Sequence, residues 1–442
     1  MGRVGKRLSS SQIIILGFAA VILLGSLLLM LPFATQNGEG AVFRDAVFTA
    51  TSAVCVTGLV VQDTAAYWSA FGQAVILFLI QIGGMGVVTV AIAVSILSGR
   101  QISLKQRSTM QEAISAHKVG GIVQMTGFII KTAILLELLG AAVMAPVFCR
   151  EFGPLKGLWY ALFHSISAFC NAGFDLMGVK GQYTSLTHFA DHPVINIVVM
   201  ALIISGGIGF MTWDDIRVNR QHIRKYRMQS KVILLTSAVL ILLPGLYFFF
   251  FEFQTAPLGE RVWSALFQSV TTRTAGFNTA DLTRISEVGT AVMIILMLIG
   301  GSPGSTAGGM KTTTAAVLLS TMVSVFRRRE HTHFFGRRVS DDTIRNAATI
   351  LMMYVTLFLA GGFVMSHVED LPLLTCLFET ASAVGTVGLT QGVTPDLGSI
   401  SRTILILLMY IGRVGGLTLI FSAVAGNQGN TARLPQEKLT VG

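Results

Sequence analysis

The chain has 442 residues, of which 52% are hydrophobic and 12% are charged, with a mean hydropathy of +0.68 and a net charge of +10. Soluble domains carry about 25% charged residues, so this composition excludes a soluble protein. Apolar runs long enough to cross a bilayer recur along the chain, and the basic residues lie in short loops between them. We therefore predict an all-α integral membrane protein whose positive charge sets membrane orientation and does not bind nucleic acid.

The N-terminus resembles a secretory signal, because Arg3, Lys6 and Arg7 precede the apolar run Ile13–Leu31. This run is too long for the apolar part of a signal and lacks a clear small-residue cleavage site, so we predict that it is the first span. The four cysteines show no CxxC spacing and lie in or beside apolar runs, which predicts buried free thiols and no disulfide or metal site. These cysteines are Cys55, Cys149, Cys170 and Cys376.

A short segment, too short to cross a bilayer and too polar for an ordinary core, occurs four times along the chain. Each copy begins with Phe, continues through small and hydroxyl residues, and ends in Gly followed by Leu or Phe. The copies are FTATSAVCVTGL from Phe48, FHSISAFCNAGF from Phe163, FQSVTTRTAGF from Phe267 and FETASAVGTVGL from Phe378. The third copy is one residue shorter between its Phe and its Gly than the other three.

Each short segment is flanked by two apolar runs, which predicts four span–pore-loop–span repeats in one chain. The predicted repeats are residues 1–99, 119–216, 230–327 and 343–426, followed by a cytoplasmic tail at 427–442. Because each repeat crosses the membrane twice, all four have the same orientation. They are then four parallel repeats that can surround one pseudo-fourfold pore along the membrane normal.

The distribution of charge predicts which way the chain lies in the membrane. The N-terminus, the loops between repeats and the tail hold 21 basic and 7 acidic residues, whereas the opposite side holds 8 basic and 14 acidic residues. The positive-inside rule places both termini in the cytoplasm. The short segments would then enter from outside through a net-acidic vestibule, which would concentrate cations. An alternative is that these acids only keep the outer loops soluble.

The four closing glycines predict an ion-selectivity filter. Irregular backbone inside a bilayer is tolerated only where protein or water satisfies it, and glycine has no side chain to block an axis. Rings of carbonyl oxygens replace the hydration shell of a cation, and the partly negative end of a preceding short helix would face the same ion. The alternative is four glycine turns that pack helices without a pore. The predicted filter residues are Val56, Thr57, Gly58, Asn171, Ala172, Gly173, Thr274, Ala275, Gly276, Thr386, Val387 and Gly388.

The second apolar run of the third repeat is interrupted by a glycine-rich stretch at 300–311. Pro303 and the surrounding glycines predict a broken helix, and a break at mid-membrane needs a polar cavity. A nucleotide-binding P-loop is improbable, because Met310 precedes Lys311 and no strand comes before the stretch. A simple kink is the alternative. We predict that this is the only second span that breaks.

Four span–pore–span repeats with VTGL, NAGF, TAGFN and TVGL endings resemble the Trk/Ktr/HKT potassium-transport superfamily over nearly the whole chain. The short termini, the FQSVTTRTAGFN stretch and the EKLTVG tail are most similar to the Ktr-type membrane subunits, KtrB. The resemblance implies uptake of K+, often stimulated by Na+, through a homodimer in the cell membrane with one pore per protomer. It also implies a cytosolic RCK-type nucleotide-binding regulatory subunit (KtrA-like). Members with four filter glycines are generally potassium-selective, and no organic cofactor is expected.

The resemblance also assigns two intramembrane features. The family's gating loop matches the interrupted stretch, and a family arginine below the filter, which would bar or pace cations, matches Arg413. A salt bridge that holds repeats together is the alternative for Arg413. The predicted gate residues are Gly300, Gly301, Ser302, Pro303, Gly304, Ser305, Thr306, Ala307, Gly308, Gly309 and Lys311.

The predicted function is therefore channel-like potassium uptake by a multi-pass protein of the plasma membrane. No cluster of His, Cys or carboxylate residues argues for catalysis, so an integral-membrane enzyme is disfavoured. The alternative is a poorly selective cation channel or sodium transporter of the same architecture, since the sequence does not give the number or field strength of the coordinating carbonyls. The basic loops Arg217–Lys231 and Arg327–Arg338 are predicted to face lipid headgroups or an acidic cytosolic partner.

Overall fold

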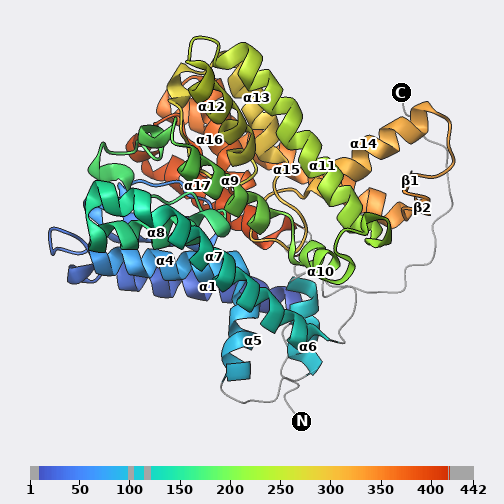
Figure 1. The fold of residues 1–442 in the computed structure, drawn as a ribbon, viewed down its shortest axis with the longest axis horizontal. Coiled ribbons are helices and arrows are strands. Elements are labelled where there is room, and N and C mark those ends of the chain that lie inside the picture. The colour runs from blue at the N-terminus through green and yellow to red at the C-terminus, as the bar shows by residue number, and fades with distance from the viewer. Residues whose placement is uncertain (1–8, 98–103, 114–120, 417, 419–442) are drawn as a thin grey trace.

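The computed structural model describes residues 9–97, 104–113, 121–416 and 418, and the regular secondary structure of these ranges is helical apart from one short hairpin (Figure 1). The predicted tail at 427–442 lies outside the described residues. Four of the described helices are long and apolar enough to cross a membrane, and a bent pair, Pro193–Gly207 with Phe210–Asn219, forms one further candidate span.

The same order of helices recurs four times along the chain: a long helix, a short helix and an apolar second helix. The long helices are α1 (Ser10–Leu29), α7 (Ile122–Phe152), α11 (Met228–Tyr247, continued by the π-helical turn Phe248–Glu252) and α15 (Asp341–Glu369). The short helices are α2 (Phe43–Val54), α8 (Pro154–Phe169), α12 (Leu258–Thr271) and α16 (Leu373–Gly385). The second helices are α4 (Ala70–Met85), α9 (Pro193–Gly207), α13 (Glu287–Leu298) and α17 (Ser399–Val414).

The remaining elements continue or connect these helices. Three helices follow a second helix after a break, namely α5 (Val87–Leu97), α10 (Phe210–Asn219) and α14 (Thr312–Phe326), while α6 (Leu104–Ala113) precedes α7 and α3 (Thr64–Tyr67) precedes α4. Short 3-10 turns lie at Pro32–Ala34, Met177–Val179, Thr187–Phe189, Ile223–Lys225, Leu282–Arg284 and Thr394–Asp396. The hairpin β1 (His333–Phe334) and β2 (Arg337–Arg338) is antiparallel.

Local sequence sets several helix starts. Ser9 caps α1 in a reciprocal capping box with Gln12, and Ser286 and Ser340 accept from the first turns of α13 and α15. Proline begins α8 and α9, where its missing N–H costs nothing. These signals fix where five of the helices begin, namely α1, α8, α9, α13 and α15.

The helices of one repeat pack on those of the next in a closed order. Each second helix contacts the short helix of the following repeat: α4 contacts α8, α9 contacts α12, α13 contacts α16, and α17 returns to α2. In Figure 1 the blue and teal helices α1, α4, α7 and α8 lie together, and α12, α13 and α16 of the third and fourth repeats lie on the other side of α9 and α17. The short helices therefore stand inside a ring that the chain closes on itself.

The prediction that only the third second span breaks is wrong, because the other three second helices also end at a glycine. Gly86, Gly209 and Gly415 have φ of 85°, 90° and 88° with ψ of 131°, 140° and 133°. This region of φ/ψ space is open essentially to glycine alone. The axes of α9 and α10 differ by 97° across their break. A single glycine inside an apolar run is also compatible with an unbroken helix, so the sequence did not reveal these three breaks.

Glycines just before the breaks allow the second helices to touch the short helices of their own repeats. A Cβ on Gly83, Gly206 or Gly412 would lie about 2 Å from the carbonyl oxygens of Val54, Phe169 and Val384, respectively. Each of these carbonyls lies at or next to the end of a short helix. The depth of these three short helices is therefore set by backbone-to-backbone contact.

Buried polar side chains also join repeats. Glu137 of α7 accepts from Gln81 Nε2 of α4 at 3.0 and 3.2 Å, so its partner lies on a helix of the first repeat. The four cysteines are free thiols, as predicted, although Cys149 is partly exposed while the other three are buried.

Substituting Gly83 by Ala is expected to destabilise the protein by about 1–3 kcal/mol, because the added methyl overpacks a contact between two backbones. Gly127→Ala is the matched control, since a Cβ on Gly127 of α7 meets nothing within 4 Å. Thermal unfolding of both variants in detergent compares them with the parent chain. Equal midpoints for G83A and G127A would contradict this account of the packing.

Candidate functional site

The loops after the four short helices share one backbone conformation. Their first residue is left-handed although it is not glycine, with φ of 57° at Val56, 57° at Asn171, 64° at Thr274 and 52° at Thr386. The closing glycines Gly58, Gly173, Gly276 and Gly388 have φ of 93°, 69°, 81° and 94°. A left-handed residue other than glycine costs about 1–2 kcal/mol and persists where its surroundings require it. All four loops are therefore held in the same strained form.

The N–H groups of these loops point back to their own short helices. The middle residue donates to a carbonyl of the helix in each repeat: Thr57 to Ser52 at 2.8 Å, Ala172 to Ser167 at 2.8 Å, Ala275 to Thr271 at 2.9 Å and Val387 to Ser382 at 2.8 Å. Gly58 and Gly388 donate to the hydroxyls of Ser52 and Ser382, both at 3.0 Å. With their donors used in this way, the loops keep their carbonyl oxygens available for another partner.

These contacts locate the residue that the third segment lacks. The middle N–H reaches five residues back in three repeats and four residues back in the third, so the difference lies between Thr271 and Ala275. Thr271 then matches Ser167, and both hydroxyls donate to the carbonyl after the closing glycine, that of Phe277 or Phe174. We did not predict this brace. Its sequence signal is a hydroxyl residue six positions before the glycine, or five in the third repeat.

The four loops meet around one ring. A Cβ on each closing glycine would point at the middle carbonyl oxygen of the next repeat, and the contacts return to the start of the chain. The distance from such a Cβ to the carbonyl oxygen would be 2.5 Å from Gly58 to Ala172 O, 2.8 Å from Gly173 to Ala275 O, 2.4 Å from Gly276 to Val387 O and 2.0 Å from Gly388 to Thr57 O. Any side chain at these glycines would therefore enter the ring of carbonyls, which accounts for glycine at all four positions.

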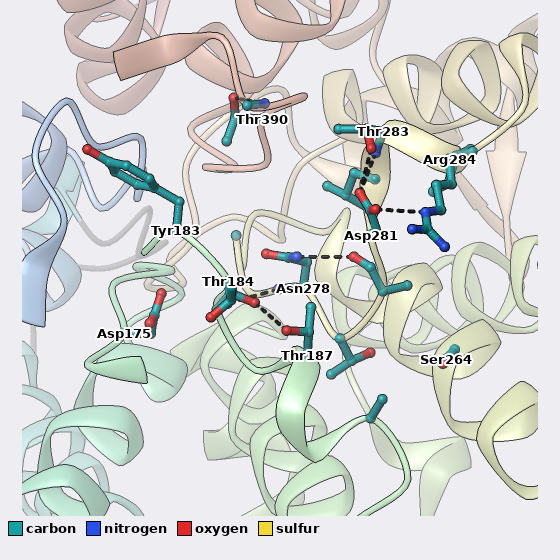
Figure 2. A pocket seen from close by; sticks show the side chains of 18 of the residues that line it. Asp175, Tyr183, Thr184, Thr187, Ser264, Asn278, Asp281, Thr283, Arg284 and Thr390 are labelled. Atoms are coloured by element: carbon teal, nitrogen blue, oxygen red, sulfur yellow. Dashed lines mark hydrogen bonds and ion pairs between the residues drawn. The ribbon is translucent and has the colours of Figure 1, made fainter. Parts of the chain in front are cut away.

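A vestibule, the cavity of about 700 Å³ on one side of the ring, is lined by all four closing glycines. Figure 2 shows Asp175, Asn278, Asp281 and Thr390 around it. The Thr283 hydroxyl and N–H, together with Arg284, hold the pKa of Asp281 below its usual range, so this carboxylate stays charged in mildly acidic solution. The lining holds four acidic residues and one basic residue: Asp175, Glu252, Glu260, Asp281 and Arg284.

The charge count made from sequence needs one correction at this point. Glu379 was counted among the acids of the outer side, but it lies in α16 and is fully buried. Asp45 pairs with Arg402 at 2.9 Å, and both residues were already in the count, so this pair leaves the net charge of that side unchanged. The acidic character of the vestibule therefore rests on fewer groups than the count implied.

The interrupted stretch of the third repeat forms a loop on the other side of the ring. Its two ends are joined, since Gly300 N donates to Met310 O at 2.7 Å and Thr312 N donates to Gly301 O at 3.0 Å. Its tip reaches the filter residues, because a Cβ on Gly308 would lie 2.1 Å from Thr386 Oγ1. Beyond the loop lies a second cavity of about 270 Å³, and the two cavities share no lining residue.

Thr306 ties this loop to the second and fourth repeats. Its hydroxyl proton is shared between Asn171 Oδ1 at 3.0 Å and Phe169 O at 3.1 Å, and its N–H donates to Gly206 O at 3.2 Å. Its carbonyl accepts from Arg413 of the fourth repeat. The loop is therefore fastened directly to the first residue of the second filter loop.

The two cations of this region bind backbone carbonyls. Arg413 donates to Gly83 O, to Gly84 O at 3.1 Å and to the loop, and no carboxylate of the described residues forms an ion pair with it. Lys311 Nζ donates to Ala307 O at 2.9 Å and to Gly308 O at 3.1 Å. Both side chains line the second cavity. Arg413 thus joins repeats, but through carbonyls and not through the salt bridge considered above.

Comparison with known proteins identifies the family. A family model described as TrkH, cation transport protein, matches residues 8–433. The chain belongs to the TrkH cation transport family. It is 40% identical to the potassium/sodium uptake protein NtpJ of Enterococcus hirae, over 100% of this chain and 99% of that protein. It is 36% identical to the Ktr system potassium uptake protein B of Bacillus subtilis, over 99% and 97% of the two chains.

A solved structure shows the same fold. The potassium transporter TrkH from Vibrio parahaemolyticus matches with a TM-score of 0.74 at 18% sequence identity, over 95% of this chain and 86% of that one. The predicted family is confirmed, and the chain is a multi-pass membrane protein of a transporter family and not an enzyme. The predicted filter, gate and barrier residues lie together in the structure, while their roles in ion passage stay predictions.

Gly388→Ala is expected to lower cation flux at least about tenfold, because its Cβ would enter the carbonyl ring 2.0 Å from Thr57 O. Gly392→Ala is the matched control, since Gly392 has a φ of 88° but a Cβ there meets nothing within 4 Å. Both substitutions strain the backbone similarly, and only the first fills the ring. Flux into proteoliposomes with equal amounts of protein measures the difference. A similar loss in both variants would show that strain, and not obstruction, is responsible.

Proposed function

We propose that this chain takes up K+ across the plasma membrane through four parallel span–pore-loop–span repeats around one pseudo-fourfold pore. The ring formed by the carbonyl oxygens of Thr57, Ala172, Ala275 and Val387 carries the proposal. Such a ring replaces the water that a cation loses, and the ends of four short helices direct their partly negative termini toward it. The relatives named for potassium uptake support K+ as the ion.

The proposed path runs from the vestibule, through the carbonyl ring and past the loop at 300–311, into the second cavity. The loop acts as the gate, because it contacts filter residues Asn171 and Thr386 and separates the two cavities. Arg413 and Lys311 add positive charge to the second cavity, which opposes the entry of a cation while the loop is in place.

The orientation and partners follow from charge and from the relatives. The vestibule faces outward and both termini are cytoplasmic, in agreement with the positive-inside rule. A homodimer, stimulation by Na+ and a cytosolic RCK-type nucleotide-binding subunit belong to the same proposal, and one of the relatives is named as part of a Ktr system. No nucleotide is expected to bind this chain itself.

Reconstitution tests the function. Uptake of K+ and of Na+ is measured separately in proteoliposomes, and growth at low K+ is measured in bacterial cells that lack their own potassium uptake. We expect rescue of growth and a preference for K+. Comparable uptake of both ions would favour the less selective cation or sodium transporter of the same architecture. No uptake of either ion by correctly assembled protein would overturn the proposal.

Thr306→Val tests the gate. Valine keeps the shape of threonine but removes the hydroxyl bonds to Asn171 and Phe169, which releases the loop from the filter. We expect several-fold higher K+ flux through the chain alone, since the lost hydrogen bond, shared between two acceptors, stabilises the closed loop by about 1 kcal/mol.

Ser305→Ala is the matched control for this variant. The Ser305 hydroxyl bonds only within the loop, to Ser302 O at 2.7 Å. Flux of S305A is therefore expected to equal that of the parent. An unchanged flux in T306V, with its folding intact, would contradict a gate held closed by this residue.

A further inference from the structure

One position of the short helices, the residue directly after the first Phe of each segment, differs in all four repeats. These residues are Thr49, His164, Gln268 and Glu379, and each is nearly or completely buried behind its filter loop. They are neither filter nor gate residues in the proposed function. Their contacts with the filter loops divide the repeats into two pairs.

Glu379 binds the segment that follows the fourth filter loop. Its Oε1 accepts from Thr390 Oγ1 at 2.7 Å and from Gln391 N at 2.9 Å, and its Oε2 accepts from Thr394 Oγ1 at 2.7 Å. Thr390 lies two residues after Gly388 and lines the vestibule with it. A carboxylate that accepts three hydrogen bonds from neutral donors is a strong and directional anchor. The fourth filter loop is thus clamped from behind just after its glycine.

His164 makes the equivalent contact in the second repeat. Its Nε2 accepts from Leu176 N at 3.3 Å, and Nδ1 donates to Tyr160 O at 2.7 Å, which is the pattern of a neutral imidazole. Leu176 and Gln391 both lie three residues after their closing glycines. The centroid of the His164 imidazole lies 5.2 Å from that of the Phe148 ring and 6.3 Å from that of the Phe277 ring. The second loop is therefore clamped at the same backbone position as the fourth.

The other two repeats lack this clamp. Thr49 Oγ1 and Gln268 Oε1 have no hydrogen-bond partner among the described residues. Gln268 Nε2 turns away from the filter segment and reaches Met293 Sδ at 3.5 Å. We call each of the four loops one wall of the ring. The loops meet in chain order around the ring, so the clamped second and fourth walls face each other across it, and so do the unclamped first and third walls.

We propose that Glu379 is a positioning residue that sets the preference for K+ over Na+, with His164 as its counterpart on the opposite wall. The inference rests on the proposed function and deepens it. A filter discriminates against a smaller ion when its carbonyls cannot close around that ion, so the walls must be held from behind. Two fixed walls facing each other keep the ring open along one diameter.

Two substitutions at Glu379 separate position from charge. Glu379→Gln removes the charge and places an NH2 group, which cannot accept a hydrogen bond, opposite one of the three donors. Glu379→Asp keeps the charge, but its side chain is one methylene shorter, so the carboxylate is withdrawn from the loop. The ratio of initial K+ to Na+ uptake is measured in proteoliposomes with equal amounts of assembled protein. We expect both variants to lower the ratio by about tenfold, a change of ~1.4 kcal/mol. His164→Phe, which refills the aromatic site without Nε2, is expected to lower it in the same direction.

Two matched controls accompany these variants. Gln268→Met alters the same position in an unclamped wall. Glu369→Gln weakens a similar carboxylate contact outside the filter loops, in which Glu369 accepts from Gly398 N at 2.9 Å. Both are expected to keep the parental ratio. Parental ratios in both Glu379 variants would overturn the inference, as would a loss in E379Q alone, which would indicate charge and not position. An equal loss in E369Q would overturn it too. Failure of the proposed function would show differently, because the parent chain itself would then carry no K+.

Discussion

The structure depends on where the backbone N–H groups of four short loops find their acceptors. Each loop returns N–H donors to the helix that precedes it, so its carbonyl oxygens are left for the ring. This arrangement requires a left-handed residue followed two positions later by glycine, and it requires a helix that ends at a fixed depth. Contacts such as Gly83 on Val54 O fix that depth, so the outer helices act on the ring through the short helices.

The same requirement explains how an irregular loop can lie inside the membrane-spanning part of the protein. The loop at 300–311 has no helix of its own to satisfy it, so its N–H groups use the exposed carbonyls of Gly206 and Gly207 at the end of α9. Its own carbonyls are satisfied by Arg413 and Lys311. Arg413 and Lys311 therefore contribute hydrogen bonds that stabilise the loop. The break at Gly209 and the loop are parts of one structure, since Phe210 N donates to Gly304 O at 2.7 Å.

Repetition made much of this visible in the sequence. Four Phe-to-Gly segments could be recognised because the same hydroxyl-rich, glycine-ended stretch recurs between apolar runs with nearly equal spacing. The glycine-rich stretch could be recognised as irregular because Pro303 and the glycines around it disfavour a continuous helix. The breaks at Gly86, Gly209 and Gly415 could not be recognised, because one glycine costs an apolar helix only about 1 kcal/mol and looks the same whether the helix continues or turns. The burial of Glu379 was missed for a related reason: a polar residue in a short, non-spanning segment is compatible with an outer loop. Its hydrogen bonds come from residues 11 to 15 positions later, a distance that helical periodicity does not report.

The departures from fourfold symmetry follow one pattern. The loop at 300–311 touches the ring at Asn171 and at Thr386, which belong to the second and fourth repeats. These are the same two walls that His164 and Glu379 clamp from behind. A gate that pressed on a compliant wall would deform the ring and alter its coordination as it opened and closed. The loop at 300–311 instead contacts the two loops that His164 and Glu379 hold from behind, so its contacts fall on the side of the ring that these buried side chains support. The first and third repeats lack this contact, since Thr49 Oγ1 and Gln268 Oε1 have no partner among the described residues. The third loop is instead bonded just after its glycine, by the Thr271 hydroxyl to Phe277 O and by Asn278 N to Ser185 Oγ. The four unequal repeats therefore support the ring through different contacts.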